Sequence, residues 1–299
     1  MSSDLTAPPQ KTREIQNHIY DSTRWNTFQF HDNDIIVATY GKSGTTWMQQ
    51  IVLQLIYNGQ ADLNVSELSP WIDCAFGQSR NQTTENLQEQ HRRCLKTQLP
   101  VDALVFSSKA KYIYVARDGR DIAWSRFNHF SNISESAHKM FENVKGSTYE
   151  RPATNVVEFY HDWLNKDGFP NLPFWQHIRS WWNIRHQPNV LLVHFQQLKN
   201  DLPGQIQRIA KFLDIKTDDD LKWNEIVEHC TFDYMKEHSD LFVPGKMSGA
   251  GSKTFIYKGT NGRWKDLLTD GDCREYEKIA EEQLGKEAAH WLATGDMEK

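Results

Sequence analysis

Glycine, lysine and hydroxyl residues gather between positions 41 and 46, directly after an apolar run. The string reads Gly41-Lys42-Ser43-Gly44-Thr45-Thr46, and Trp47 follows it. Glycine lets a backbone approach a ligand closely, and the free N–H groups and dipole of a helix start attract anions. The string therefore favours a phosphate-binding turn to which Lys42 adds a full charge. It is not a Walker A loop, because GxxxxGK[ST] cannot be laid over it. The alternative is an ordinary helix start capped by threonine.

Two further segments carry cations suited to an anion. Arg117 ends a β-branched run and opens the string RDGRD, with Ser125 two helical turns farther on. A guanidinium can hold a phosphate through two parallel hydrogen bonds. The other charged residues of that string are better explained as caps and solvated side chains. Lys258 and Gly259 begin a KGxxGxWK string near the end of the glycine-rich segment 244–262. That string is either a tight turn or a loop that closes over an anionic ligand.

The elements that must position these residues alternate between strands and helices. Strands are predicted at 34–40, 111–116 and 190–195, and helices at 47–57, 121–130, about 205–213, within 155–186 and at 275–293. This alternation predicts an α/β fold, with a central parallel sheet flanked by helices. Ligands of such sheets bind beyond the carboxyl ends of the strands, where the first two basic segments fall.

Composition narrows the class of protein. The chain has 299 residues and a net charge of −5, which argues against nucleic-acid binding because that function favours a basic surface. The four cysteines form no CxxC pair, so we expect neither a metal site nor a disulfide framework. No apolar run approaches the ~20 residues of a membrane span, and the start does not resemble a signal peptide. We therefore expect a cytoplasmic protein without a membrane segment.

Taken together, these segments resemble the cytosolic sulfotransferase family. Residues 40–47 resemble its TYPKSGTTW loop with Gly41 in place of proline, and 114–125 resemble YVARxxxDxxxS. Lys96-Thr97-Gln98-Leu99-Pro100 resembles KTHLP, and 255–265 resembles the closing loop RKGxxGDWK. The resemblance implies one α/β domain with a P-loop-like strand–loop–helix. We expect this domain to span 31–299, behind an N-terminal extension at 1–30.

Members of that family transfer a sulfonate from 3′-phosphoadenosine 5′-phosphosulfate (PAPS) to a hydroxyl or amine and release 3′-phosphoadenosine 5′-phosphate (PAP). The resemblance implies that no metal takes part. It implies a catalytic group of Lys42, Lys96 and Gln98. The implied cofactor-binding residues are Lys42, Ser43, Gly44, Thr45 and Thr46 at the 5′-phosphosulfate, Trp47, Phe195 and Cys230 at the adenine, and Arg117, Ser125, Tyr257, Lys258 and Gly259 at the 3′-phosphate.

Gln98 is the departure that bears on activity. The family has a histidine base at this position, and a neutral amide has no useful basicity near pH 7. Three accounts are open. The acceptor arrives ionised, or another residue such as His129 or His91 substitutes, or this is an inactivated variant that holds both ligands. The corresponding alternatives to an active sulfotransferase are a pseudo-enzyme that binds PAPS without turnover and a P-loop nucleotide kinase.

The acceptor is expected to be a small aromatic or apolar molecule. Candidate wall residues are Trp71, Phe76, Phe130 and Phe141, each of which is equally well explained as core. The family's dimer motif KxxxTVxxxE has lost its valine and glutamate, because Asp270 and Arg274 stand at those positions. A homodimer stays open, but not through the usual motif.

Overall fold

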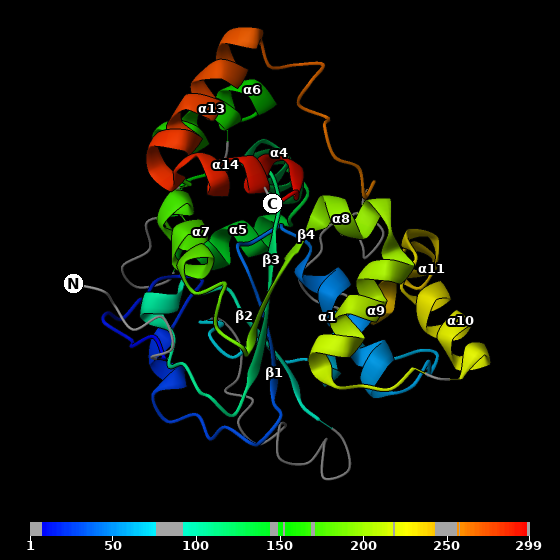
Figure 1. The fold of residues 1–299 in the computed structure, drawn as a ribbon. Helices are drawn as coiled ribbons and strands as arrows, with labels where there is room; N and C mark the ends of the chain where they lie inside the picture. The colour runs from blue at the N-terminus through cyan, green and yellow to red at the C-terminus, as the bar shows by residue number, and fades with distance from the viewer. Residues whose placement is uncertain are drawn as a thin grey trace.

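The computed structural model describes residues 8–75, 92–143, 149–151, 153–168, 171–217, 219–242, 256 and 258–297. Within them a parallel sheet runs through the centre of the molecule (Figure 1). Its strands are β1 (Ile35–Thr39), β2 (Cys94–Thr97), β3 (Lys111–Ala116) and β4 (Val190–His194), in the order β2-β1-β3-β4. The parallel sheet confirms the predicted fold class.

Helices cover both faces of the sheet. On the right in Figure 1 are α1 (Thr45–Ile56), α8 (Phe195–Asn200), α9 (Leu202–Leu213), α10 (Asp220–His229) and α11 (Phe232–Glu237). On the left and above are α4 (Gly119–Phe130), α5 (Glu135–Glu142), α6 (Val156–Asn165), α7 (Phe174–Asn183), α13 (Asp270–Leu284) and α14 (Lys286–Thr294). The short helices are α2 (Val65–Leu68) and the 3₁₀ turns η1 (Ser22–Trp25), η2 (Val101–Ala103) and η3 (Ser239–Leu241).

Two apolar cores sandwich the sheet because successive strand residues point to opposite faces. Ile36 and Ala38 of β1 face a core rich in tryptophan, whereas Ile35 and Val37 face an aliphatic core beneath α1 and α9. The tryptophan-rich core contains Trp25, Trp163, Trp175, Trp181, Trp182 and Trp291. Most of the chain's tryptophans therefore stabilise the fold by packing.

The predicted elements differ from the observed ones mainly at their junctions. Strand β2 was not predicted, and α8 fills a gap between a predicted strand and helix. The aromatic stretch at 155–186 is two helices, α6 and α7, separated by a turn in which Asp167 and Gly168 have positive φ. The predicted C-terminal helix is interrupted at Gly285, whose φ of 81° and ψ of 162° suit glycine.

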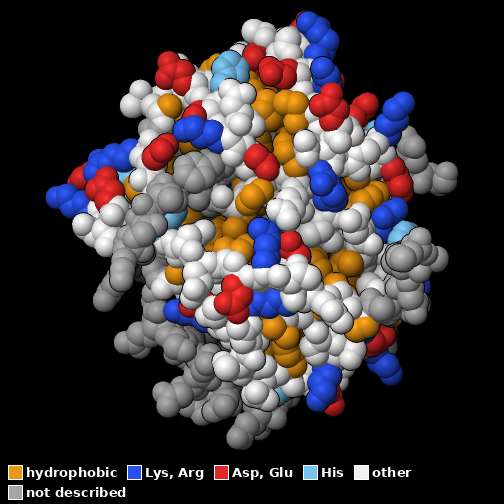
Figure 2. Space-filling model, turned by 90° about the vertical axis from the view of Figure 1, so that its left-hand side faces the viewer, with side chains coloured by type: hydrophobic (Ala, Val, Ile, Leu, Met, Phe, Trp, Pro, Cys, Tyr) orange, Lys and Arg blue, Asp and Glu red, His pale blue; other side chains and the backbone are white. Residues whose placement is uncertain are grey.

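Charged side chains are mixed on the face turned to the viewer in Figure 2, where Lys and Arg lie among Asp and Glu. This face carries no large area of a single charge. In the part of the chain that the structure describes, no helix has the length and apolar character needed to cross a membrane.

Candidate active site

The turn between β1 and α1 forms the centre of the candidate site. Lys42 and Gly44 both have positive φ, of 76° and 103°, and this left-handed pair turns the chain sharply into the helix. Thr39 at the end of β1 and Thr45 at the start of α1 join their Oγ1 atoms at 2.6 Å. The buried Ser43 hydroxyl has no hydrogen-bond partner among the described residues. An orphaned buried hydroxyl is costly, so its position favours a ligand oxygen here.

Aromatic residues enclose one side of this turn. A Cβ on Gly44 would lie 2.7 Å from Cδ2 of Phe195, so only glycine allows this close approach. Phe195 meets Trp47 edge to face, with ring centroids 5.3 Å apart. The Trp47 indole Nε1 donates to the Cys230 carbonyl at 2.8 Å. The three residues predicted to lie near an adenine are therefore brought together.

Arg117 follows β3 and is held at the same edge of the sheet. Its Nε donates to Oδ1 of Asn261 at 2.9 Å, and its Nη2 donates to the Thr260 carbonyl at 3.0 Å. Its guanidinium carbon also lies 4.3 Å from the centroid of the Phe195 ring. The loop that contains Lys258 thus contacts Arg117 through Thr260 and Asn261. Asn261 was not predicted, although it lies inside the KGxxGxWK string.

The same loop is fastened at two further points. Asp121 of α4 accepts a hydrogen bond from the Gly262 amide at 2.8 Å. Burial raises the pKa of Asp121 to about 6, and neighbouring Asp118 adds to this effect. Gly259 has a φ of 59°, and a Cβ there would lie 2.6 Å from the ring of Phe232. Lys258 itself is exposed.

Cations dominate the electrostatics around the turn. Desolvation lowers the pKa of Lys42 to about 7, and the charges of Arg126, Arg117 and Lys96 contribute to this shift. Desolvation also lowers the pKa of Lys96 to about 8, although its ammonium lies 4.1 Å from the Trp71 ring centroid, a favourable cation–π distance. An anion bound beside these lysines would raise their pKa again and favour their charged forms.

Gln98 is held rigidly at the end of β2. Its backbone N–H donates to Oδ2 of Asp73 at 3.1 Å, and its backbone carbonyl accepts from Nε2 of His177 at 3.2 Å. Its side-chain Oε1 accepts from the Tyr20 hydroxyl at 3.2 Å. Gln98 thus lies in the same region as Lys96 and the turn, but the carbonyl end of its side chain is already engaged.

His129, a predicted substitute base, lies in the same cationic surroundings. Burial and the charges of Lys42, Arg126 and Lys96 hold the pKa of His129 well below its usual range. A histidine with so low a pKa is a weak base at neutral pH.

The structure adds Arg126 and His18 to the site. Arg126 is only 4% exposed, and its Nη1 lies 3.5 Å from where a Cβ on Gly41 would be. Arg126 follows the buried Ile122 by one helical turn, so both lie on the same face of α4. A charged residue on the apolar face of the predicted helix was the sequence signal that could have identified it. His18 is 1% exposed, and neither of its ring nitrogens has a partner among the described residues. Nothing in the sequence pattern marked it.

The other predicted positions are less closely joined. Ser125 lies on α4, partly exposed, and makes no hydrogen bond to a described residue; Thr46 is also partly exposed. Phe130 lies 5.3 Å from the Arg126 guanidinium, and Phe141 packs edge-on against His18 at 5.9 Å. Tyr257, Phe76 and His91 lie outside the described residues.

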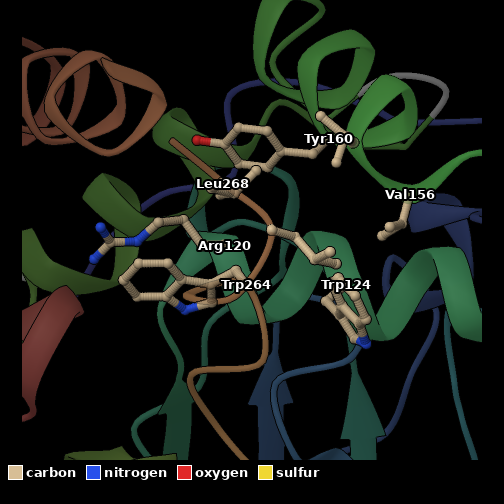
Figure 3. A pocket seen from close by; sticks show the side chains of 8 residues that line it. Arg120, Trp124, Val156, Tyr160, Trp264 and Leu268 are labelled. Atoms are coloured by element: carbon tan, nitrogen blue, oxygen red, sulfur yellow. The ribbon is translucent and has the colours of Figure 1, made fainter. Parts of the chain in front are cut away.

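Figure 3 shows a small pocket between α4, α6 and the segment 264–268, with apolar and aromatic walls. It is lined by Arg120, Trp124, Val156, Val157, Tyr160, Trp264, Leu267 and Leu268. Arg120 stacks 3.8 Å from the Trp264 ring centroid and pairs with Asp118 at 2.7 Å. None of the lining residues was predicted for the site. The contact between Trp264 and Arg120 thus holds the segment after Gly262 against α4.

Comparisons with known proteins agree on one family. The model of the sulfotransferase domain matches residues 32–287. A glycolipid sulfotransferase of Mycobacterium bovis is 29% identical over 288 residues, covering 87% of this chain and 88% of that protein. Sulfotransferase 1B1 of Mus musculus is 29% identical over 273 residues, covering 87% and 86%.

Two solved structures share the fold. Mouse sulfotransferase SULT7A1 in complex with PAP matches with a TM-score of 0.66 at 19% identity, covering 90% of this chain and 91% of that one. Retinol dehydratase in complex with retinol and PAP matches with a TM-score of 0.66 at 21% identity, covering 88% and 84%.

Proposed function

This chain belongs to the sulfotransferase family, and we propose that it transfers a sulfonate group from PAPS to a hydroxyl or amine of a small aromatic or apolar acceptor. The observation that carries the proposal is the convergence of Lys42, Lys96 and Arg117 on the turn at Ser43. Desolvated cations beside an orphaned buried hydroxyl suit a compact, highly charged anion. PAP in two structural neighbours supports the same ligand class.

The residues present fit PAPS. The turn at 42–46 would hold the 5′-phosphosulfate, because the Ser43 hydroxyl and the first amides of α1 are the donors there. Trp47 and Phe195 would contact the adenine, with the Cys230 backbone fixing Trp47. Arg117, Lys258 and Gly259 would contact the 3′-phosphate, with Ser125 and Tyr257 as further candidates. No His, Cys, Asp or Glu cluster suited to a metal occurs among the described residues.

When bound, PAPS supplies an activated sulfonate whose leaving group is a phosphate. Lys42 would provide positive charge where negative charge grows as that group departs, and such preorganised stabilisation is usually the largest single term in catalysis. Lys96, stacked on Trp71, holds a second charge beside the transferring group. Gln98, fixed at the end of β2, positions the acceptor but cannot take its proton.

The proposed acceptor chamber lies beyond Gln98. Trp71, Phe130 and Phe141 would supply its apolar wall. Retinol in one structural neighbour supports an apolar acceptor.

We propose further that residues 31–299 act as one domain and that the protein works in the cytoplasm. Any homodimer would use a surface other than the altered motif at 265–274.

Binding and turnover experiments test the proposal. Calorimetry would compare PAP with ATP–Mg²⁺, and we expect tighter binding of PAP; preferred binding of ATP would indicate a kinase instead. A single-turnover assay with labelled PAPS and a panel of phenols, alcohols and amines would then detect transfer. Binding of PAP without any transfer would identify a pseudo-enzyme.

A further inference from the structure

Arg126 lies close to Gln98, the position at which the family has its histidine base. Its Nη1 and the Oε1 of Gln98 lie 3.5 and 3.4 Å from the same point, the position of a Cβ on Gly41. Gly41 and Gln98 are also two of the positions at which the chain departs from its family's strings. Both departures therefore meet at Arg126.

Arg126 is buried without a counter-charge. Arg126 is 4% exposed, and among the described residues no carboxylate lies within 4 Å of its guanidinium. Its described contacts are the faces of Phe130 at 5.3 Å and Tyr40 at 6.0 Å. A largely buried guanidinium with no carboxylate beside it favours an anionic ligand, so the surroundings of Arg126 point to an anion.

The groups around Arg126 are weak proton acceptors in the free protein. The Oε1 of Gln98 accepts from Tyr20, and its Nε2 amide is a donor. The titratable groups that face Arg126 are Lys42, His18, Tyr20, Tyr40 and His129. Burial lowers the pKa of both histidines, and an anion beside Lys42 would restore its proton. In the free protein, both histidines are therefore weak bases near neutral pH.

We propose that Arg126 binds the reacting oxygen of the acceptor in its ionised form, so that the enzyme selects acidic hydroxyls such as phenols with electron-withdrawing groups. This inference rests on the proposed sulfonate transfer. The acceptor loses its proton to solvent before the chemical step. Its oxyanion then forms the new O–S bond while the bond between sulfur and the phosphate oxygen of PAPS breaks. The bonding pair leaves on that phosphate oxygen, and no proton moves.

The test needs no turnover. 4-Nitrophenol would be titrated with pH in the presence of the protein–PAP complex, and its ionisation followed by the visible absorbance of the phenolate. We expect the pKa of the bound phenol to fall by about one unit or more below that of the free phenol. Arg126→Gln should abolish most of this shift, whereas the exposed, charge-matched control Arg274→Gln should retain it. PAP affinity should change less than about two-fold in either variant, because Arg126 faces the acceptor.

An unshifted phenol in the wild-type complex, or an equal shift in Arg126→Gln, would overturn the inference while the proposed function stands. Failure of the wild-type protein to bind PAP would overturn both. A rate comparison covers the case in which Arg126→Gln does not fold. At pH 7 the wild-type protein should transfer sulfonate to 4-nitrophenol at least about ten-fold faster than to cyclohexanol, and equal rates would refute the selection of ionised acceptors.

Discussion

The two sides of the site differ in how their polar groups are satisfied. On the donor side, Arg117 is fixed by Asn261, Thr260 and Phe195, and the turn follows the family string closely. On the acceptor side, both ring nitrogens of His18 have no hydrogen-bond partner among the described residues, and no described carboxylate lies within 4 Å of the Arg126 guanidinium. Apart from the orphaned Ser43 hydroxyl, the side proposed to bind PAPS is preformed by the protein. The other side is completed only by its own ligand.

This difference has an energetic meaning. An unsatisfied buried polar group costs ~1–3 kcal/mol, and a charged one costs more. Such groups at the acceptor side lower the free energy of unfolding of the free protein. Binding of the acceptor should therefore raise that free energy. Four predictions test whether the two sides are separate in this way.

The largest effect is expected for Lys42→Met. Loss of the cation at the departing phosphate should lower kcat by about 10²–10³-fold, the usual effect of removing one preorganised charge. Initial rates with labelled PAPS would measure this. Lys278→Met, at a side chain that is 76% exposed on α13, is the matched control. A change in kcat of less than about three-fold would show that Lys42 is not at the reacting centre.

Arg117→Met should separate binding from chemistry. Loss of one charged contact weakens binding by ~1.5–3 kcal/mol, so we expect PAP affinity to fall about 10- to 150-fold while kcat changes little. Calorimetry with PAP and a saturation curve for PAPS would measure both. Should kcat fall with PAP affinity unchanged, Arg117 would have to be assigned to the acceptor side.

Gln98→His should raise activity toward weakly acidic acceptors. A general base gives ~10²–10⁴-fold, but the cations nearby would lower the pKa of this histidine. We therefore expect a gain of about ten-fold with phenol and little change with 4-nitrophenol. Gln98→Asn keeps an amide and serves as the control. A gain below a few-fold with phenol would remove the argument from the missing base.

The smallest effect concerns pH. The pKa of Lys42 is about 7 in the free protein against 10.5 in an unfolded chain, so the unfolded state binds more protons. Between pH 6.5 and 7.5 the free energy of unfolding should therefore rise by about 0.7 kcal/mol, while PAP affinity falls about three-fold. Denaturation and calorimetry at the two pH values would measure these changes. Both should disappear in Lys42→Met, and a PAP affinity independent of pH in the wild-type protein would contradict the low pKa.

The sequence predicted the donor side better than the acceptor side for a physical reason. Lys42, Gly44 and Arg117 follow strands, and strand ends can be located from apolar runs. The pairing of Tyr20 with Gln98 and the approach of Arg126 to Gly41 depend on tertiary packing across long separations. His18 lies in an N-terminal segment with no periodic pattern. Only the charge on the buried face of α4 marked Arg126 in advance.

The pairing of the strands also bears on how the protein folds. Ile35 of β1 pairs with Cys94 and with Lys111, and Tyr112 of β3 pairs with Val190. Each pairing closes a long loop before any contact compensates for the lost entropy, so folding should be slow for a chain of this size. Because Lys96 lies in β2 while Lys42 and Arg117 follow β1 and β3, their charges come together only after those pairings form. The mutual repulsion of the cations therefore arises late in folding, after the native strand pairings have formed.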